Sequence, residues 1–278
     1  MKEKAVSKIR EMSGHNYVKL TNCGNTAIFV ALYIAKKLNP KPFILIPDQG
    51  GWMTYKTFPK LLNFEVKFIK TDDGLINLDD LAEKAKTGAA LLFQSIAGYF
   101  VEQPIEEIAK ICHDNNCLVI QDVSGSLGQK DICKGKDADM MIGSFGRWKL
   151  IDMELGGFIS SNDDHFHDND ALNLAKHNID MEVLLKKLEE ADARFNFLLE
   201  RANKIKSELM RHDIVHRDKK GLNVIVRFKD DDEKKEITSY CKDNELEYTT
   251  CPRYIRLEDD AISIEVKRLP YKDHGDKE

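Results

Sequence analysis

The sequence predicts an α/β protein with a doubly wound, mostly parallel seven-stranded sheet and a small α+β domain at the C-terminal end. Three observations predict this fold: short uninterrupted apolar runs, amphipathic helix patterns between them, and a change of composition after Asp163. Buried parallel strands carry continuous runs of Val, Ile and Leu because helices cover both faces of the sheet. Strands that alternate with helices are typical of doubly wound sheets.

Seven apolar runs are the expected strands of this sheet. In chain order they are residues 17–20, 43–46, 66–69, 89–93, 118–120, 140–142 and 158–159. Helix patterns lie between several of them, at residues 26–38, 78–86 and 105–115. We therefore expect a large domain over residues 1–163.

The remaining residues, 164–278, are expected to form the small domain. A polar, acidic segment at residues 162–170 is typical of a linker. After it, apolar residues at helical spacing predict a long helical stretch over roughly residues 181–211. The pattern then predicts a strand, a helix and two more strands, at residues 222–228, 233–243, 246–249 and 261–266. The last nine residues are expected to be frayed.

Charge and apolar content narrow the class of protein. The 278 residues carry a formal net charge of −5, which does not favour a general nucleic-acid binder. The first twelve residues are charged throughout and lack the apolar core of a secretory signal. No apolar run approaches the roughly 18–20 residues that span a bilayer. We expect a cytoplasmic protein with no membrane partner.

The cysteines do not form a metal-binding or disulfide pattern. All six are scattered, without a CxxC pair, and are expected to be reduced thiols: Cys23, Cys112, Cys117, Cys133, Cys241 and Cys251. Cys112, His113 and Cys117 lack the second ligand pair of a zinc site. His165 and His167 in the acidic linker are read as part of a solvated loop. No metal is expected.

Asp122 is the first candidate functional residue. It ends the strand CLVIQD and is followed by the small residues VSGSLG. In open parallel sheets, ligands bind beyond the carboxyl ends of the strands, so this carboxylate is expected to face a cofactor crevice. The alternative is an ordinary turn or helix-capping aspartate.

Lys149 is the second candidate. It lies in a loop after the strand at 140–142, between Trp148 and Leu150, and ahead of Gly156 and Gly157. Apolar neighbours desolvate an amine and favour its neutral, nucleophilic form. The alternative is an ordinary surface lysine.

Two further sites complete the pattern. Gly24, Asn25 and Thr26 open a strong helix, whose free N–H groups suit a phosphate, although an ordinary helix cap gives the same pattern. Trp52 follows a Gly-Gly bend after the second strand, where it is expected either to lie against a planar ring or to belong to the core.

In their order along the chain, these motifs resemble those of fold type I pyridoxal-phosphate (PLP) enzymes, the aspartate aminotransferase superfamily, and most of all the DegT-type sugar aminotransferases. The match rests on Cys23-Gly24-Asn25-Thr26 at the first helix and on Ser144-Phe145-Gly146-Arg147-Trp148-Lys149 followed by Gly156-Gly157. It covers roughly residues 17–160, and the Ser-Phe-x-x-x-Lys motif is its most specific part.

The resemblance implies PLP as cofactor and a role for each matching residue. Lys149 is implied to form the Schiff base with PLP and to shuttle a proton, and Asp122 to keep the pyridine nitrogen protonated. Gly24, Asn25, Thr26 and Ser144 are implied phosphate contacts. Trp52 is implied to stack on the ring. Ser95 is implied to lie near the cofactor phenol oxygen.

Three functional hypotheses follow from the resemblance. The first is an aminotransferase acting on an amino acid or an amino or keto sugar, with a small-molecule amino donor and a carbonyl acceptor. The second is another PLP chemistry on the same fold: a lyase, a desulfurase or a selenocysteine-synthase-like transferase. The third is a compact PLP-binding relative without catalysis. A plain nucleotide-binding domain lacks support because the chain contains neither GxGxxG nor GxxxxGK[ST].

Two features of the resemblance concern substrate and assembly. An aminotransferase usually holds a substrate carboxylate with a bidentate arginine, and the candidates are Arg147, Arg253, Arg256 and Arg268. The resemblance also implies a homodimer. At one position the chain departs from its relatives: they often carry Gln or His three residues after the cofactor aspartate, and this chain has Gly125.

Overall fold

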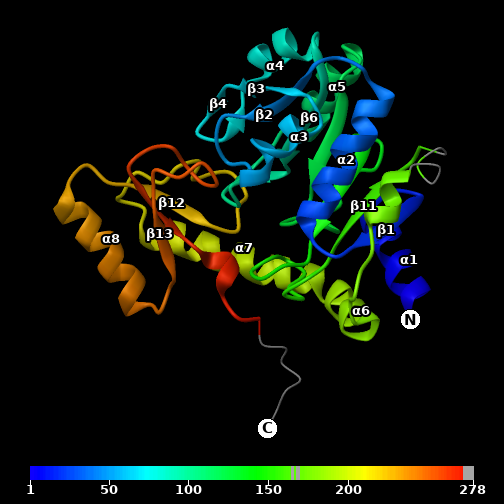
Figure 1. Ribbon diagram of the computed structural model, residues 1–278. Coiled ribbons are helices and arrows are strands. Elements are labelled where there is room, and N and C mark those ends of the chain that lie inside the picture. Colours follow the sequence, from blue (N-terminus) through cyan, green and yellow to red (C-terminus); the bar gives the residue numbers. More distant parts are fainter. Residues whose placement is uncertain (164–165, 167–169, 272–278) are drawn as a thin grey trace.

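The computed structural model describes residues 1–163, 166 and 170–271. The chain forms two lobes connected by the long helix α7 (Ala191–Glu208) (Figure 1). The linker histidines His165 and His167 and the tail from residue 272 lie outside the described residues. The domain boundary near residue 163 stays a prediction.

The larger lobe contains a seven-stranded sheet in the order β1-β11-β10-β9-β6-β2-β3. Its strands are β1 (Tyr17–Thr21), β2 (Phe43–Pro47), β3 (Glu65–Ile69), β6 (Gly88–Gln94), β9 (Leu118–Asp122), β10 (Met140–Ser144) and β11 (Gly157–Ser161). Neighbouring strands from β10 to β3 pair in parallel, and β11 runs antiparallel to both of its neighbours. Each of the seven predicted runs lies in one of these strands, so the predicted fold class is confirmed.

Helices cover both faces of this sheet, which explains the uninterrupted apolar runs. The helices α2 (Gly24–Leu38) and α3 (Phe58–Leu61) cover one face, and α1 (Lys2–Ser13), α4 (Leu78–Ala85) and α5 (Ile105–Asp114) cover the other. Along β2, Ile44 and Ile46 pack toward α2, while Leu45 between them packs into the opposite core. Each buried aliphatic side chain of this kind contributes about 1.5–3 kcal/mol.

Several short elements were not predicted. They include α1, α3, the 3-10 turns η1 (Met53–Tyr55) and η3 (Asp170–Leu174), and the hairpins β4 (Thr71–Asp72) with β5 (Leu75–Ile76) and β7 (Ile96–Ala97) with β8 (Val101–Glu102). Two-residue strands are too short for a periodic pattern. Helix α1 buries only three residues and is polar overall, so its sequence resembles a solvated segment.

Residues 191–268 form the smaller lobe, hereafter the C-terminal unit. Its antiparallel sheet has the order β12-β14-β13. Its elements after α7 are β12 (Val224–Arg227), α8 (Asp231–Asp243), β13 (Tyr248–Thr250), β14 (Ala261–Ile264) and the 3-10 turn η4 (Val266–Arg268). These elements match the predicted strand, helix and two strands to within a few residues.

The predicted helical stretch over residues 181–211 is helical over most of its length, but it consists of two helices. The chain breaks at Glu190 into α6 (Met181–Glu189) and α7. Helix α6 packs against α1 in the larger lobe, whereas α7 runs on to β12 and η4 in the C-terminal unit. Two helices with different packing partners explain the break, and apolar spacing alone does not reveal it.

The C-terminal unit contacts the larger lobe at loops that follow β2 and β6. The N–H of Gly50 donates to the carbonyl of Tyr254 over 2.7 Å, and the N–H groups of Leu222 and Asn223 donate to the carbonyl of Tyr99 over 2.7 and 2.8 Å. Phe100 of the larger lobe also packs with buried residues of the C-terminal unit in a small hydrophobic cluster. The two lobes are therefore joined beside the carboxyl ends of the parallel strands.

Candidate active site

A cavity of about 150 Å³ lies at the carboxyl ends of the parallel strands β6, β9 and β10. Its lining brings together six of the eight residues predicted to bind the cofactor: Gly24, Asn25, Trp52, Asp122, Ser144 and Lys149. Parallel strands place their last residues at one edge of the sheet, so residues far apart in sequence meet there.

Asp122 is held in place by two donors. It ends β9, is 7% exposed, and accepts hydrogen bonds from the Ser124 N–H at 2.9 Å on one oxygen and from the Tyr55 hydroxyl at 2.7 Å on the other. Burial, followed by the charge of Asp122, raises the pKa of Tyr55 well above its usual value, so this hydroxyl remains a donor. A carboxylate has about four acceptor positions, so Asp122 keeps capacity for a donor inside the cavity.

Lys149 lies in the loop between β10 and β11. The loop is anchored by the buried side chains of Leu150 and Ile151, and its backbone bends at Trp148, whose φ is +63°. The Lys149 amine donates to the hydroxyl of Tyr99 over 2.9 Å and lies 4.9 Å from the centre of the Trp52 ring. The lysine is thus half-buried among aromatic rings, and its amine reaches the cavity.

The first turn of α2 forms another wall of the cavity. No side chain caps this helix end, whose N-cap residue is Cys23. A β-carbon on Gly24 would lie 2.6 Å from that of Ser144, so glycine lets the helix end approach β10 closely. Asn25 accepts a hydrogen bond from the Trp52 indole N–H over 3.0 Å and so orients that ring. Free N–H groups at a helix start suit an anion.

Ser95 and Thr26 do not line the cavity. The Ser95 hydroxyl donates to the Asp122 carbonyl over 3.0 Å and contacts the Ser126 hydroxyl at 2.6 Å. Neighbouring residues of a strand point to opposite faces, and it is Gln94 that lines the cavity. The Thr26 hydroxyl bonds the side chain of Asn22 instead.

Sequence reasoning missed Gln94, Tyr55, Ser124 and Tyr99. Gln94 is 6% exposed and its carbonyl oxygen has no hydrogen-bond partner within the described part of the chain. Gln94 ends β6 and pairs with Asp122 in the neighbouring strand. The alternation of side chains along a strand could therefore have predicted that it faces the cavity. The other three are defined by contacts across the fold and carry no local motif.

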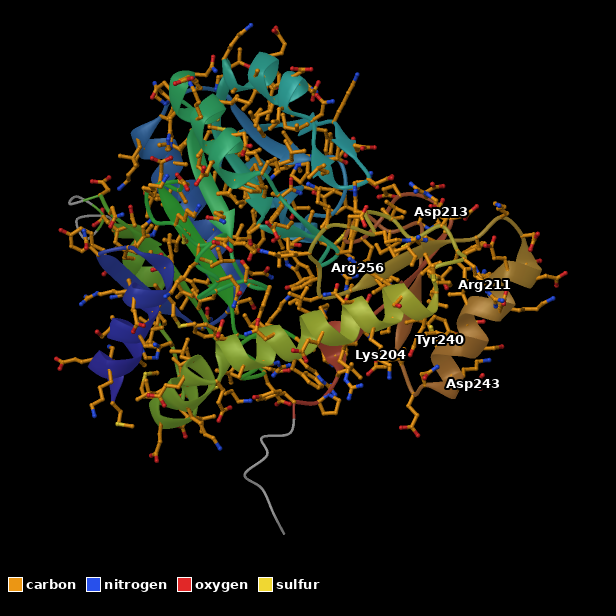
Figure 2. All side chains as sticks on the ribbon, turned by 180° about the vertical axis from the view of Figure 1, so that it is seen from behind. Lys204, Arg211, Asp213, Tyr240, Asp243 and Arg256 are labelled. Atoms are coloured by element: carbon orange, nitrogen blue, oxygen red, sulfur yellow. The ribbon has the colours of Figure 1, made fainter. Side chains whose placement is uncertain are left out.

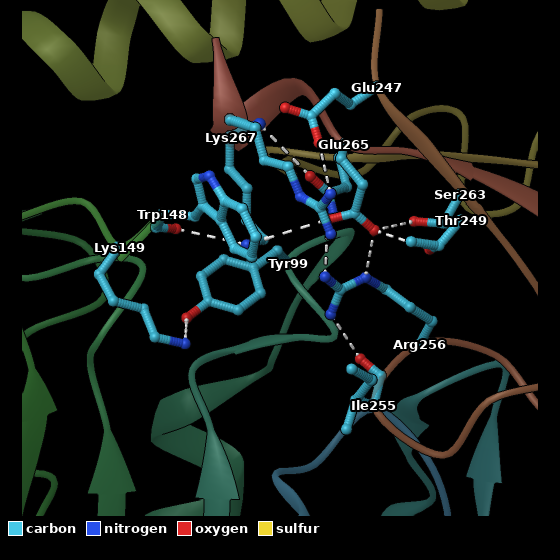
Figure 3. Close-up of polar contacts among 12 residues, drawn as sticks. Tyr99, Trp148, Lys149, Glu247, Thr249, Ile255, Arg256, Ser263, Glu265 and Lys267 are labelled. Carbon is cyan, nitrogen blue, oxygen red and sulfur yellow. Dashed lines mark hydrogen bonds and ion pairs between the residues drawn. The ribbon is translucent and has the colours of Figure 1, made fainter. Parts of the chain in front are cut away.

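The four candidate arginines differ in whether they already bond a carboxylate of this chain. Arg256 forms a two-fold ion pair with the buried Glu265, at 2.8 and 2.7 Å (Figure 3). Arg268 donates to Glu247 over 2.6 Å and stacks on Trp148. Arg147 is exposed, with its guanidinium 4.9 Å from the centre of the same ring, and Arg253 is exposed as well.

Within residues 1–163, 166 and 170–271, no group of three or more His, Cys, Asp and Glu side chains has the geometry to hold a metal ion. In that same part of the chain, no helix combines the length and apolar character needed to cross a membrane. All six cysteines are free.

Solved structures of similar fold carry several chemistries. The cysteine desulfurase of Thermococcus onnurineus NA1 aligns with 95% of this chain and 78% of its own, at 13% identity and a TM-score of 0.71. The alanine–glyoxylate aminotransferase of Nostoc sp. aligns with 95% and 80%, at 13% identity and a TM-score of 0.72. A GDP-4-keto-6-deoxymannose-3-dehydratase variant with bound GDP-perosamine aligns with 94% and 87%, at 14% identity and a TM-score of 0.68. At these identities the likeness shows the fold alone.

Sequence comparison identifies the family. No relative was found among curated protein sequences. The model of the MJ1341 family C-terminal domain matches residues 192–276, which overlap the C-terminal unit. The model of the DegT/DnrJ/EryC1/StrS aminotransferase family matches residues 3–200, well over half of the chain. The chain therefore belongs to the DegT/DnrJ/EryC1/StrS aminotransferase family, whose members are PLP-dependent enzymes.

Proposed function

We propose that this protein is a PLP-dependent aminotransferase that bonds its cofactor through Lys149 and acts on an amino acid or an amino or keto sugar. One observation carries the proposal: the amine of Lys149 and the carboxylate of Asp122 line the same cavity at the carboxyl edge of the sheet. An amine that bonds the aldehyde and an acid for the ring nitrogen are the two groups that PLP chemistry requires of a protein.

The cavity lining fits PLP at three places. The uncapped start of α2, which Gly24 allows to pack closely against Ser144, and the Ser144 hydroxyl would hold the phosphate. Trp52 would stack on the ring. The buried amide of Gln94, whose oxygen lacks a partner in the described structure, would face a polar group of the ring.

Each residue then has a defined task. Bound PLP supplies an electron sink for the bond broken at the substrate carbon next to the amine. The Asp122 carboxylate, oriented by Tyr55 and Ser124, holds a proton on the ring nitrogen because a nearby negative charge favours the protonated form. The Lys149 amine moves the proton at the substrate carbon.

Arg147 is the best of the four arginines for a substrate carboxylate. Arg256 and Arg268 already bond carboxylates of this chain, so a substrate would have to displace them. Arg147 is exposed and lies two residues from the reacting lysine. We therefore propose that it contacts the substrate, which Arg147→Lys tests by a raised KM with little change in kcat.

An absorbance spectrum of the purified protein with added PLP tests the proposed function. We expect a visible band that is absent in Lys149→Ala, and its conversion by amino donors to the pyridoxamine form. Lys60→Ala, at an exposed lysine, is the matched control and should behave as the parent. A parent protein that retains no chromophore would refute the proposal.

The same sample distinguishes the other PLP chemistries on this fold. Release of sulfide from L-cysteine would indicate a desulfurase, and release of ammonia without a pyridoxamine form would indicate a lyase. Conversion of the band by an amino donor, followed by its recovery with a carbonyl acceptor, supports the aminotransferase.

Two further proposals concern the whole protein. We propose a homodimer, which sedimentation or light scattering measures directly. We propose a cytoplasmic location, which fractionation of the source cells measures.

A further inference from the structure

Tyr99 contacts the proposed reacting amine, although no motif pointed to it. Its hydroxyl accepts a hydrogen bond from the Lys149 amine over 2.9 Å, and its side chain is buried, with 4% exposure (Figure 3). A lysine amine sits on a flexible four-carbon stem. A fixed acceptor on a buried ring therefore limits where that nitrogen lies.

The backbone holds Tyr99 in an unusual conformation. It lies in the turn between β7 and β8 with a φ of +68°, which residues other than glycine adopt only when their surroundings hold them there. Its N–H donates to Ile96, and its carbonyl accepts from the N–H groups of Leu222 and Asn223 at 2.7 and 2.8 Å. Two of these three bonds come from the C-terminal unit, so that unit determines where the tyrosine lies.

Gly125 provides the space for the Tyr99 ring. A β-carbon at position 125 would lie 2.8 Å from the ring carbon Cε1, closer than real contacts allow. Gly125 does not have a positive φ, so its backbone does not need glycine. The glycine is therefore explained by the ring that occupies the space of its missing side chain.

Basic side chains surround the same ring. The amine of Lys267 lies 4.7 Å from its centre, that of Lys149 5.1 Å, and the Arg256 guanidinium 5.7 Å (Figure 3). Lys267 and Arg256 belong to the C-terminal unit, where Arg256 is fixed by Glu265. Attraction between the Arg256 guanidinium and the ring face adds to the backbone contacts that hold Tyr99.

We propose that the Tyr99 hydroxyl positions the Lys149 amine for its bond to an aldehyde, and that the C-terminal unit sets the position of this tyrosine. The inference rests on the proposed function. In the reaction, the lone pair of the neutral amine forms the C–N bond, and the aldehyde oxygen leaves as water with both amine hydrogens. Tyr99 fixes the direction of the nitrogen and is not consumed.

The variant Tyr99→Phe tests the hydroxyl because it keeps the ring and its packing. The probes are PLP and 4′-deoxypyridoxine 5′-phosphate, which has a methyl group where PLP has its aldehyde. Quenching of tryptophan fluorescence measures binding of the second probe, and absorbance measures covalent capture of the first. We expect unchanged binding of deoxypyridoxine phosphate and capture of PLP slowed by about tenfold, the loss of one hydrogen bond.

Tyr240→Phe is the matched control. Tyr240 also donates a hydrogen bond, to Glu208. It lies between α7 and α8 at the outer end of the C-terminal unit (Figure 2). Arg256, which contacts the Tyr99 ring, lies instead between the lobes. It should bind both probes like the parent. Gly125→Ala is a second test, because its β-carbon displaces the ring and should slow capture without changing the tyrosine.

A measurement without cofactor tests the contact itself. Trace acetylation followed by mass spectrometry compares the reactivity of Lys149 with that of the exposed Lys60. Loss of the acceptor in Tyr99→Phe frees the amine and should raise its relative reactivity by about threefold to tenfold.

The possible outcomes separate the two proposals. If Tyr99→Phe captures PLP as fast as the parent, or binds deoxypyridoxine phosphate much more weakly, the positioning role is overturned while the proposed function stands. Unchanged reactivity of Lys149 in Tyr99→Phe overturns it too. If the parent captures neither probe, the proposed function fails, and this inference fails with it.

Discussion

Two polar clusters of this chain differ in how completely their hydrogen bonds are satisfied. In the C-terminal unit, Glu265 accepts bonds from five donors: two from Arg256 and one each from Asn223, Thr249 and Ser263. At the cavity, Gln94 has a buried oxygen without a partner among the described residues, and the start of α2 lacks a side-chain cap.

The difference indicates which cluster serves the fold and which serves a ligand. A buried carboxylate with every position satisfied stabilises the folded chain and has nothing left for a ligand. A buried polar group without a partner is costly, and at the wall of a cavity a bound molecule can complete it.

Glu265→Gln should cause the largest effect, on stability. Burial by itself would raise the pKa of Glu265, but the bonds and charge of Arg256 lower it to about 2, so the group is charged at neutral pH. Removing that charge leaves buried cations unpaired and should cost about 3–5 kcal/mol of unfolding free energy. Urea denaturation measures it. Lys86→Gln, which breaks an exposed pair with Glu83, is the control and should change nothing measurable.

Asp122→Asn should slow the reaction and leave the fold unchanged. The amide keeps the shape of the side chain but loses the charge that favours a protonated ring nitrogen. We expect PLP to remain bound and conversion by amino donors to slow by about a hundredfold or more. Stopped-flow absorbance measures the rate, and a rate equal to that of the parent would remove the role assigned to this carboxylate.

Lys267 should make stability depend on pH. Burial, together with the charge of Arg256, lowers its pKa from 10.5 to about 6. Between these values the unfolded chain binds the proton and the folded chain does not, so stability should rise as pH increases from about 6 toward 10. The slope is at most about 1.4 kcal/mol per pH unit.

The variant Lys267→Met isolates this contribution. It should remove the slope and be more stable than the parent near pH 6, where the parent carries a buried cation. Denaturation at several pH values checks both points, and parallel curves for the two proteins would contradict the account.

Gln94→Leu should have the smallest effect, and it contrasts the two clusters directly. Replacing a buried group that lacks a partner by an apolar one should leave the cofactor-free protein equally or more stable. PLP affinity should nevertheless fall by about threefold to tenfold, because the ligand loses a polar partner. Thermal melts with and without PLP measure both. If the variant is less stable without PLP and binds PLP as tightly as the parent, Gln94 serves the fold and not the ligand.

Local sequence was sufficient to predict the strands of the sheet and many residues of the candidate site. The seven strands are continuous apolar runs because both faces are buried, and their last residues bring Asp122, Ser144 and the helix start at Gly24 to one edge. Trp52 and Lys149 were found because they follow strands at motif spacing. Each of these inferences could be made without knowing which residues, remote in sequence, lie close together in the fold.

What the sequence could not predict depends on contacts across the fold. Ser95 was implied by the family resemblance, but Gln94 lines the cavity, because the direction of each side chain depends on the pleat of the strand. Tyr99 reaches Lys149 only through a left-handed turn held by another part of the chain. The break at Glu190 likewise arises from the different neighbours of α6 and α7.

Identification of the lysine that bonds PLP tests the central claim most directly. Two lysines, Lys149 and Lys267, lie beside the Tyr99 ring, so a cofactor adduct alone does not distinguish them. Borohydride reduction of the protein with PLP, followed by peptide mass spectrometry, fixes and locates the bond. The account predicts a single modified position, Lys149. Modification of Lys267 or of exposed lysines alone, with Lys149 unmodified, would contradict it.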